Sequence, residues 1–219
     1  MTPYEAALCA KIAYLDNGAA AARKLGFSYQ AVRRKSHFAW IGRRGSLTVI
    51  AFRGTVFSRA GRRHYQTNIA TDLVPWMGAG LVHDGFHHAM WQIVAAVRRQ
   101  RIDGENIVLT GHSMGAALAV LAARFLSARR VHAFACPRIG NRAFAKNITA
   151  HVRIIRYVNR GDFLSRLPFR GTVRGCDPEQ TEAYVPAGRV VRLSTFGHGI
   201  SAYVSGARRQ RKRYLATNY

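Results

Sequence analysis

One stretch of the chain decides its fold, residues 107–118, which read IVLTGHSMGAAL. The β-prone residues at its start predict a short buried strand, and the small residues at its end predict a helix. Between them, GHSMG fits G-x-S-x-G, which predicts a sharp, strained turn that raises the Ser113 hydroxyl off the end of a sheet. Gly111 and Gly115 remove side chains where strand and helix nearly touch, and the Met114 N–H then points to where an oxyanion would form. Ser113 is therefore a candidate nucleophile; the plainer alternative is an idle serine in a surface turn.

The rest of the chain extends this unit into an α/β sheet. From residue 84 onward, strand-like and helix-like segments alternate, which predicts a mostly parallel central sheet flanked by helices, with right-handed crossovers. Before residue 84, antiparallel strands lead into a central one. We expect strands at 27–32, 38–41, 46–53, 107–110, 131–135, 152–158 and 190–193, and helices at 2–25, 84–101, 114–128, 142–150 and after residue 199. No repeat or linker is visible, so residues 1–219 are expected to form a single domain.

Composition is typical of a globular protein. The chain has 219 residues, of which 48% are hydrophobic, enough for a full core. No apolar run is long enough to cross a membrane, and the N-terminus resembles an amphipathic helix rather than a signal peptide. We therefore expect a cytoplasmic protein, or one exported by a non-classical route. The cysteines (Cys9, Cys136 and Cys176) are too few for a disulfide framework, and Cys136 is expected to be a small core residue.

The net charge is the unusual bulk property of the chain. Its 34 Lys and Arg residues outnumber 10 Asp and Glu residues, which gives a formal net charge of +24. The excess is spread along the chain, with a denser basic tail at about 207–219. Such a charge attracts polyanions such as anionic membrane surfaces and nucleic acid. No specific nucleic-acid partner is expected, because no RNP-like, zinc-finger or helix-turn-helix pattern is visible. The alternative is a compositional bias that only keeps the protein soluble.

The order of residues along the chain narrows the choice of partners for Ser113. In an α/β-hydrolase arrangement the nucleophile, the acid and the base follow one another in that order. The acids after Ser113 are Asp162, Asp177, Glu179 and Glu182, and His198 is the one histidine that follows any of them. His198 is therefore the candidate base. Asp162 is the favoured acid because it comes just after an apolar strand, at the sheet edge where such sites are built, whereas the others lie in a polar run.

These residues suit acyl transfer. Ser113 Oγ would attack an acyl carbonyl, His198 would take its proton and return it to the leaving alcohol, and Asp162 would fix the imidazole tautomer. A second oxyanion donor is expected after the early central strand, where Thr55 offers its N–H and its hydroxyl. The alternatives are a capping or core role for His198 and an N-cap or loop role for Asp162.

Residues 56–80 are expected to be an irregular, lid-like segment at the substrate rim, with a plain surface loop as the alternative. Within this segment the sequence predicts that Trp76 and Met77 are exposed. Exposed apolar side chains at such a place favour contact with an apolar ligand.

A cluster of histidines suggests a metal site, but the sequence as a whole does not predict one. His83, Asp84, His87 and His88 lie close in sequence, and His83 and His87 would share one helix face. However, no Glu follows His83 as in H-E-x-x-H, and no third ligand is obvious. Surface or helix-start histidines are the favoured interpretation.

Several segments together resemble the class 3 lipases, the family of the filamentous-fungal triacylglycerol lipases. In the family's order, the matching segments are FRGT (52–55), TDL (71–73), VHDGF (82–86), GHSMGAALA (111–119), CPRIGN (136–141), VNRGDFLSRLP (158–168) and GHGISAYV (197–204). The resemblance implies an α/β-hydrolase fold and hydrolysis of carboxylic esters without cofactor or metal. It also implies Ser113, Asp162 and His198 as the catalytic residues, with Thr55 and Met114 as the oxyanion hole.

The sequence thus predicts an esterase or lipase whose partner is an acyl ester lipid. One alternative is a phospholipase A-type enzyme on anionic membranes, where the net charge of +24 would concentrate it by peripheral contact. The other is a non-catalytic hydrolase-fold protein that binds through its basic surface.

Overall fold

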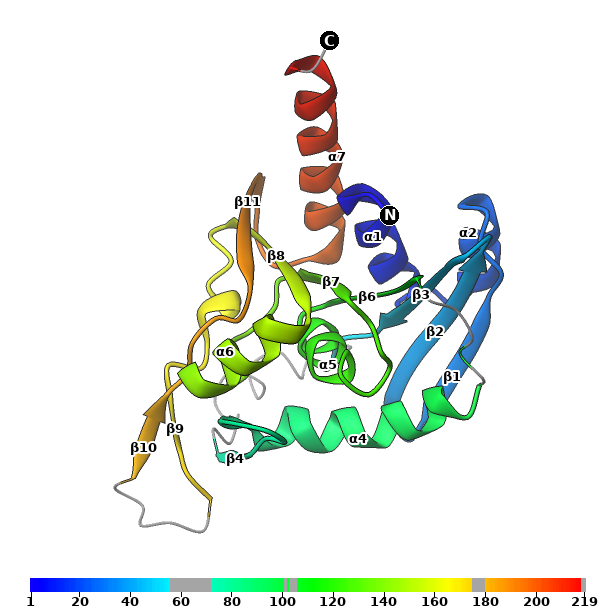
Figure 1. The fold of residues 1–219 in the computed structure, drawn as a ribbon. Coiled ribbons are helices and arrows are strands. Elements are labelled where there is room, and N and C mark those ends of the chain that lie inside the picture. The colour runs from blue at the N-terminus through cyan, green and yellow to red at the C-terminus, as the bar shows by residue number, and fades with distance from the viewer. Residues whose placement is uncertain (56–71, 101, 103–105, 175–179, 218–219) are drawn as a thin grey trace.

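The computed structural model of the chain describes residues 1–55, 72–100, 102, 106–174 and 180–217. Its central sheet has seven strands in the order β1-β2-β3-β6-β7-β8-β11 (Figure 1). These strands are β1 (Gln30–Arg34), β2 (His37–Arg44), β3 (Leu47–Phe52), β6 (Asn106–His112), β7 (Arg130–Phe134), β8 (Arg153–Arg160) and β11 (Arg189–Phe196). Two short antiparallel pairs lie outside this sheet: β4 (Leu73–Pro75) with β5 (Leu81–His83), and β9 (Arg170–Thr172) with β10 (Thr181–Ala183).

The direction of the strands confirms the sequence prediction. Strands β1, β2 and β3 pair antiparallel, whereas β3, β6, β7, β8 and β11 pair parallel. Parallel strands end at the same edge of a sheet, so the residues that follow them gather there. Ser113 follows β6, Asp162 comes two residues after β8, and His198 comes two residues after β11.

Helices cover both faces of the sheet (Figure 1). The core on one face includes α4 (Asp84–Arg98), α5 (Met114–Ala122) and α6 (Arg142–His151). The cores on the other face include α1 (Pro3–Ile12), α2 (Gly18–Lys24) and α7 (Ile200–Thr217), and α7 contains most of the expected basic tail. Burial on both faces explains why β3 is buried over its whole length. Among the described residues, no helix has both the length and the apolar character to span a bilayer.

The prediction of one continuous helix over residues 2–25 is wrong, because the structure has two helices there. α1 begins with a capping box between Thr2 and Glu5 and ends at Ile12. Asn17 then caps α2 by accepting a hydrogen bond from the Ala20 N–H. Asn and Gly are poor helix formers in a helix interior, and Asn satisfies the free N–H groups of a new helix, so the chain breaks there.

The lid-like segment expected at 56–80 falls mostly outside the described residues, since 56–71 are not among them. The described remainder is not irregular throughout. It contains β4, and the Trp76 N–H donates to the Gly80 carbonyl in the turn that leads to β5. Backbone pairing between β4 and β5 therefore orders this part of the segment.

The turn between β6 and α5 depends on two glycines. A Cβ atom at Gly115 would lie 2.3 Å from the Phe52 carbonyl oxygen, and one at Gly111 would lie 2.2 Å from the Gly115 carbonyl oxygen. No side chain fits at either distance, so α5 begins directly against the ends of β3 and β6. This confirms the prediction that both glycines remove side chains where strand and helix nearly touch.

We expect Gly115→Ala to lower the unfolding free energy by more than about 2 kcal/mol, because the added methyl group overlaps backbone atoms that are themselves fixed in the sheet. Gly199→Ala is the matched control, since nothing lies within 4 Å of its Cβ position, and it should cost less than about 1 kcal/mol. Urea denaturation of both variants measures the difference. Equal effects would contradict the steric account of the turn.

Candidate active site

Ser113 lies at the tip of the turn between β6 and α5 with a strained backbone. Its φ of 58° and ψ of −129° are rare for a residue other than Gly, and such a conformation costs on the order of 1–3 kcal/mol. Hydrogen bonds on both sides hold it: the Ser113 N–H donates to the Phe134 carbonyl, and the Ser113 carbonyl accepts from Ala116, both at 2.9 Å. Its hydroxyl does not cap α5, so it is available to other partners. The predicted strained turn is confirmed.

The Ser113 hydroxyl lies within hydrogen-bond distance of the His198 imidazole, which lies within hydrogen-bond distance of the Asp162 carboxylate. Ser113 Oγ lies 3.0 Å from Nε2 of His198, and Nδ1 of His198 lies 2.9 and 3.0 Å from the two carboxylate oxygens of Asp162. A carboxylate can only accept, so Nδ1–H donates to it, and unprotonated Nε2 accepts from the serine. The structure thus brings together the residues that chain order selected. Of the other acids after Ser113, Glu182 is exposed on β10 and the rest fall in 175–179, outside the described residues.

Asp162 is held in its charged form although its side chain is fully enclosed. Burial by itself raises its pKa. Hydrogen bonds from His198 and Tyr203, the charge of His198 and the backbone N–H of Ser165 outweigh burial and hold the pKa of Asp162 below its usual value. A buried carboxylate that stays ionised is able to stabilise positive charge on the neighbouring imidazole.

Tyr203 is a residue of this site that the sequence analysis did not single out. It lies near the start of α7, donates its hydroxyl to the Asp162 carboxylate, and accepts the Asn159 N–H at 3.1 Å. Its position, five residues after His198, distinguishes it in no way from a core tyrosine. Only the packing of α7 against β8 and β11 brings its hydroxyl to Asp162.

His112 was also missed, although a polar residue at the end of an apolar strand was a usable signal. Its Nε2 donates to the His198 backbone carbonyl at 2.6 Å, and its Nδ1 accepts from the Tyr14 hydroxyl at 3.0 Å. The same hydroxyl accepts the Gly54 N–H at 3.0 Å. Burial and the neighbouring His198 lower the pKa of His112 to about 4, so it is neutral near pH 7. His112 therefore ties the loop that carries His198 to the end of β6.

The two predicted oxyanion residues lie together beside the serine. The Thr55 hydroxyl donates to Met114 Sδ at 3.6 Å, and a Cβ atom at Gly54 would lie 3.3 Å from Ser113 Cβ. The Met114 N–H is in the first turn of α5, where N–H groups have no acceptor within the helix. Among the described residues, neither this N–H nor that of Thr55 is hydrogen-bonded, so both are free to donate to a ligand.

An apolar recess of about 30 Å³ opens beside Ser113 and His198. Its other walls are Phe86, Ala135, Pro137, Leu164, Leu167 and Pro168. This volume is far below the roughly 300–1,000 Å³ that is typical of small-molecule sites, so the recess holds only a small part of an apolar ligand in this conformation.

The prediction that Trp76 is exposed is wrong. Its side chain is only 5% exposed and packs edge-on against Phe125 and Phe144. Pairing of β4 with β5 places the ring in the core, where it buries more apolar area than a rim position would allow. Met77, the next residue, is 53% exposed as expected, and its part in a substrate rim stays a prediction.

The histidines near the start of α4 make hydrogen bonds with neighbouring residues of the same helix. Nδ1 of His83 accepts the Phe86 N–H at 3.3 Å as the cap of α4, and burial lowers the pKa of His83 to about 4. Nε2 of His87 accepts from the Trp91 indole at 2.9 Å. Within the described ranges, no three His, Cys, Asp or Glu side chains are grouped so as to hold a metal ion.

Comparison with known proteins agrees with this geometry. Residues 49–172, more than half of the chain, match the family described as lipase (class 3). The chain belongs to the class 3 lipase family. It is 30% identical over 156 residues to the secreted mono- and diacylglycerol lipase A of Penicillium cyclopium, a match that covers 65% of this chain and 50% of that protein. This class 3 lipase family member therefore spans about half the length of the curated relatives it matches.

Two further relatives are informative. The Rhizomucor miehei lipase in its propeptide complex superposes with a TM-score of 0.65 at 21% identity, over 87% of this chain and 65% of that one. This likeness shows that the class 3 lipase family member has the α/β-hydrolase fold. The chloroplastic phospholipase A(1) DAD1 of Arabidopsis thaliana is 35% identical over 71 residues, which cover 29% of this chain and 16% of that protein.

The low pKa of His112 makes the stability of this class 3 lipase family member depend on pH. Its pKa is about 4 in the folded state against 6.5 for an ordinary histidine. Between these values the unfolded chain binds more protons, so the unfolding free energy falls as the pH falls from 6.5 to 4. His83, whose folded pKa is also about 4, acts in the same direction. We expect each to contribute a loss of roughly 2 kcal/mol over this range.

Urea denaturation at pH 7 and pH 4.5 measures this loss. The His112→Gln variant should lose less stability between the two pH values than the wild type. The His88→Gln variant should follow the wild type, because His88 is exposed. An equal loss in all three proteins would show that His112 does not set the pH dependence.

Proposed function

We propose that this chain is a serine hydrolase that cleaves the carboxylic esters of lipids, with Ser113, His198 and Asp162 as its catalytic residues. The observation that carries the proposal is the continuous set of hydrogen bonds from Asp162 through His198 to Ser113. A serine hydroxyl is a poor nucleophile near neutral pH unless a neighbouring base takes its proton. Membership of the class 3 lipase family supports the same reaction.

In the first half of the proposed reaction, Ser113 Oγ attacks the acyl carbonyl carbon while Nε2 of His198 takes the hydroxyl proton. The carbonyl electron pair moves onto oxygen, and the N–H groups of Thr55 and Met114 donate to the oxyanion. When the intermediate collapses, the bond to the leaving oxygen breaks and His198 gives its proton to that oxygen. An alcohol leaves, and the acyl group stays on Ser113.

In the second half, water attacks the acyl carbon while His198 takes a proton from it. Collapse of this intermediate returns the proton to Ser113 Oγ and releases a carboxylic acid. Asp162 stays ionised throughout, because its hydrogen bonds hold its pKa low, and its charge stabilises the imidazolium form of His198. Tyr203 acts as a positioning residue, because it binds the carboxylate without touching the serine.

The apolar recess beside Ser113 is the proposed binding place for the start of the acyl chain. An acyl chain gains free energy by leaving water for such a surface. The Penicillium relative is named for monoacylglycerols and diacylglycerols, so we propose partial acylglycerols as the substrate class of this chain.

Replacement of the catalytic residues tests the proposal. Ser113→Ala should lower kcat/KM for p-nitrophenyl esters by roughly 10⁴-fold or more, because no other group attacks the carbonyl, and Asp162→Asn should lower it by roughly 10³-fold or more, because the imidazole loses its orienting charge. Ser46→Ala and Asp16→Asn, both at exposed positions, serve as matched controls and should keep wild-type activity. A Ser113→Ala protein with full activity, or a wild type without activity on any ester, would overturn the assignment.

The size of the recess generates a separate prediction about chain length. Leu164→Ala removes part of its wall and should raise the preference for longer over shorter p-nitrophenyl esters about tenfold, because each accommodated methylene adds binding energy. Leu15→Ala is the control, since this leucine is exposed and does not line the recess. An unchanged ratio of kcat/KM values across the ester series would place the acyl chain elsewhere.

A further inference from the structure

The backbone that follows β3 leaves the sheet just before the proposed oxyanion donor. The Arg53 N–H still donates to the Phe38 carbonyl of β2 at 2.9 Å. The next two residues, Gly54 and Thr55, form what we call the oxyanion loop. The Gly54 N–H donates to the Tyr14 hydroxyl at 3.0 Å, whereas no described residue accepts the Thr55 N–H. The Tyr14 hydroxyl is therefore the last described group that binds this backbone before the Thr55 N–H.

Close packing around position 54 explains why the oxyanion loop needs this hydrogen bond. A Cβ atom built at Gly54 would overlap the Tyr14 hydroxyl and the His112 carbonyl oxygen, and it would lie 3.3 Å from Ser113 Cβ. Only glycine fits there, and glycine restricts its own backbone less than any other residue. The hydrogen bond to Tyr14 therefore limits a freedom that the close packing itself introduces.

Tyr14 reaches the site because α1 packs on the sheet. Cys9 and Ile12 of α1 belong to the same core cluster as Val108 of β6. Tyr14 follows α1 directly, and its ring packs edge-on against the His112 ring, with the centroids 5.8 Å apart. The position of its hydroxyl is thus set by the hydrophobic core on this face of the sheet and not by a surface loop.

The hydrogen bonds from Gly54 to His198 all run in one direction. A carbonyl oxygen only accepts, so Nε2 of His112 carries the proton that it donates to the His198 carbonyl at 2.6 Å. Nδ1 of the neutral His112 ring is then unprotonated and accepts from the Tyr14 hydroxyl at 3.0 Å, while the His112 carbonyl is a more distant acceptor at 3.3 Å. The Tyr14 oxygen in turn accepts the Gly54 N–H. Each hydrogen bond in this series polarises the next.

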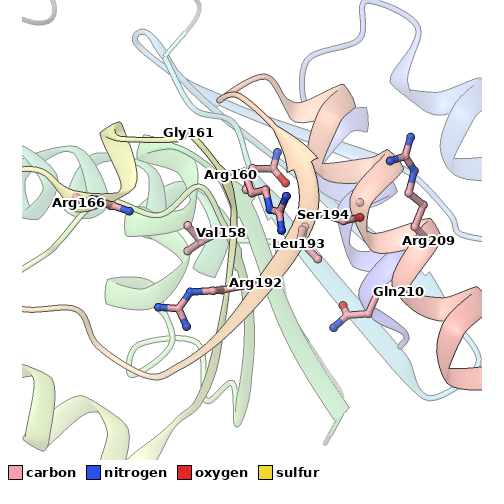
Figure 2. A pocket seen from close by; sticks show the side chains of 11 residues that line it. Val158, Arg160, Gly161, Arg166, Arg192, Leu193, Ser194, Arg209 and Gln210 are labelled. Carbon is pink, nitrogen blue, oxygen red and sulfur yellow. The ribbon is translucent and has the colours of Figure 1, made fainter.

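The sheet alone does not position the loop that carries His198. The pairing of β11 with β8 shifts register in the second half of β11. A hollow of about 610 Å³ lies beside this part of the strand, between β8, β11 and α7 (Figure 2). Beyond the shift, the Gly197 N–H donates to the Arg160 carbonyl at 3.0 Å, and the next carbonyl, that of His198, accepts from His112. The bond from His112 therefore positions the backbone of the base itself.

The oxyanion loop and the His198 loop have to be placed relative to each other because they act on the same carbonyl group. His198 takes the proton of Ser113 as the serine attacks the carbon, while the Thr55 N–H donates to the carbonyl oxygen. Such a donor stabilises the oxyanion only when it lies within about 2.7–3.1 Å of the place that the charged oxygen will occupy. A misplacement of about 1 Å can cost a rate factor on the order of 10².

We propose that Tyr14 is a positioning residue, whose hydroxyl sets the oxyanion loop relative to the His198 loop through Gly54 on one side and His112 on the other. This inference rests on the proposed ester cleavage, because the oxyanion forms only in that reaction. Tyr14 acts through these two partners, so its loss weakens binding of the transition state and leaves binding of an uncharged ligand unchanged.

The test compares two inhibitors of the same shape on the full chain. Ser113 Oγ adds to the carbonyl carbon of an alkyl trifluoromethyl ketone, its proton passes to His198, and the carbonyl electron pair becomes an oxyanion. The corresponding secondary alcohol forms no oxyanion. The Tyr14→Phe variant removes the hydroxyl and keeps the ring. Tyr29→Phe is the matched control, because the Tyr29 ring stacks on Trp40 and its hydroxyl lies at Gly18.

We expect Tyr14→Phe to lower kcat/KM for p-nitrophenyl butyrate by about tenfold or more, and to weaken inhibition by the ketone by a similar factor. Inhibition by the alcohol should change by less than about twofold, and Tyr29→Phe should leave all of these values within about twofold. Exhaustive reaction with a fluorophosphonate counts the active serines, so each rate refers to folded enzyme. Equal weakening of the ketone and the alcohol by Tyr14→Phe, or an unchanged ketone, would overturn the proposal.

A second variant, His112→Gln, interrupts the same series of hydrogen bonds one residue further on. If Tyr14 acts through His112, adding Tyr14→Phe to this variant should lower kcat/KM by less than about threefold, because the link is already broken. A double variant that loses the product of both single effects would contradict the link. His112→Gln also carries the inhibitor comparison by itself should urea denaturation show that Tyr14→Phe does not stay folded.

The two proposals fail in different ways. A wild type that neither cleaves esters nor reacts with the fluorophosphonate would overturn the proposed function. An active wild type whose activity and ketone inhibition are unaffected by Tyr14→Phe would overturn only the positioning role of Tyr14.

Discussion

The candidate active site depends on one backbone contact, between the ends of β3 and β6 and the first turn of α5. Gly115 lies against the Phe52 carbonyl and Gly111 lies against Gly115, so neither position has room for a side chain. This contact forces Ser113 to a φ of 58°. Hydrogen bonds to β7 and within α5 offset the cost of that conformation. Because Ser113 cannot relax into the helix, its hydroxyl stays where His198 reaches it.

Buried side-chain hydrogen bonds then position the His198 loop and Gly54, which the contact between β3, β6 and α5 does not position by itself. His112 holds the His198 carbonyl, and Tyr14 joins His112 to Gly54 beside the proposed oxyanion site. Since burial lowers the pKa of His112, this link is made by a neutral ring and adds no positive charge beside His198.

The spacing of apolar residues along the chain predicted the helices and strands whose own sequence shows a helical or strand-like period. The spacing of Phe86, Met90, Ile93, Val94 and Val97 predicted α4, where all five are buried, and alternating segments predicted the parallel sheet. The helix expected at 2–25 failed because Asn17 starts a new helix, a local signal that the apolar spacing masked. The exposure expected of Trp76 failed for a tertiary reason, since Phe125 and Phe144 come from distant parts of the chain to cover it.

The sequence by itself determined which residues were candidates for the site. G-x-S-x-G selects the serine, and the rule of chain order leaves one histidine and favours one carboxylate, because these are constraints along the chain. Only the tertiary structure decided that His198 lies within 3.0 Å of both Ser113 and Asp162, and that Tyr203 and His112 support this arrangement. The physical reason is that such distances arise from the packing of α7 and β11 against β8, which joins residues far apart in the chain and leaves no local pattern in the sequence.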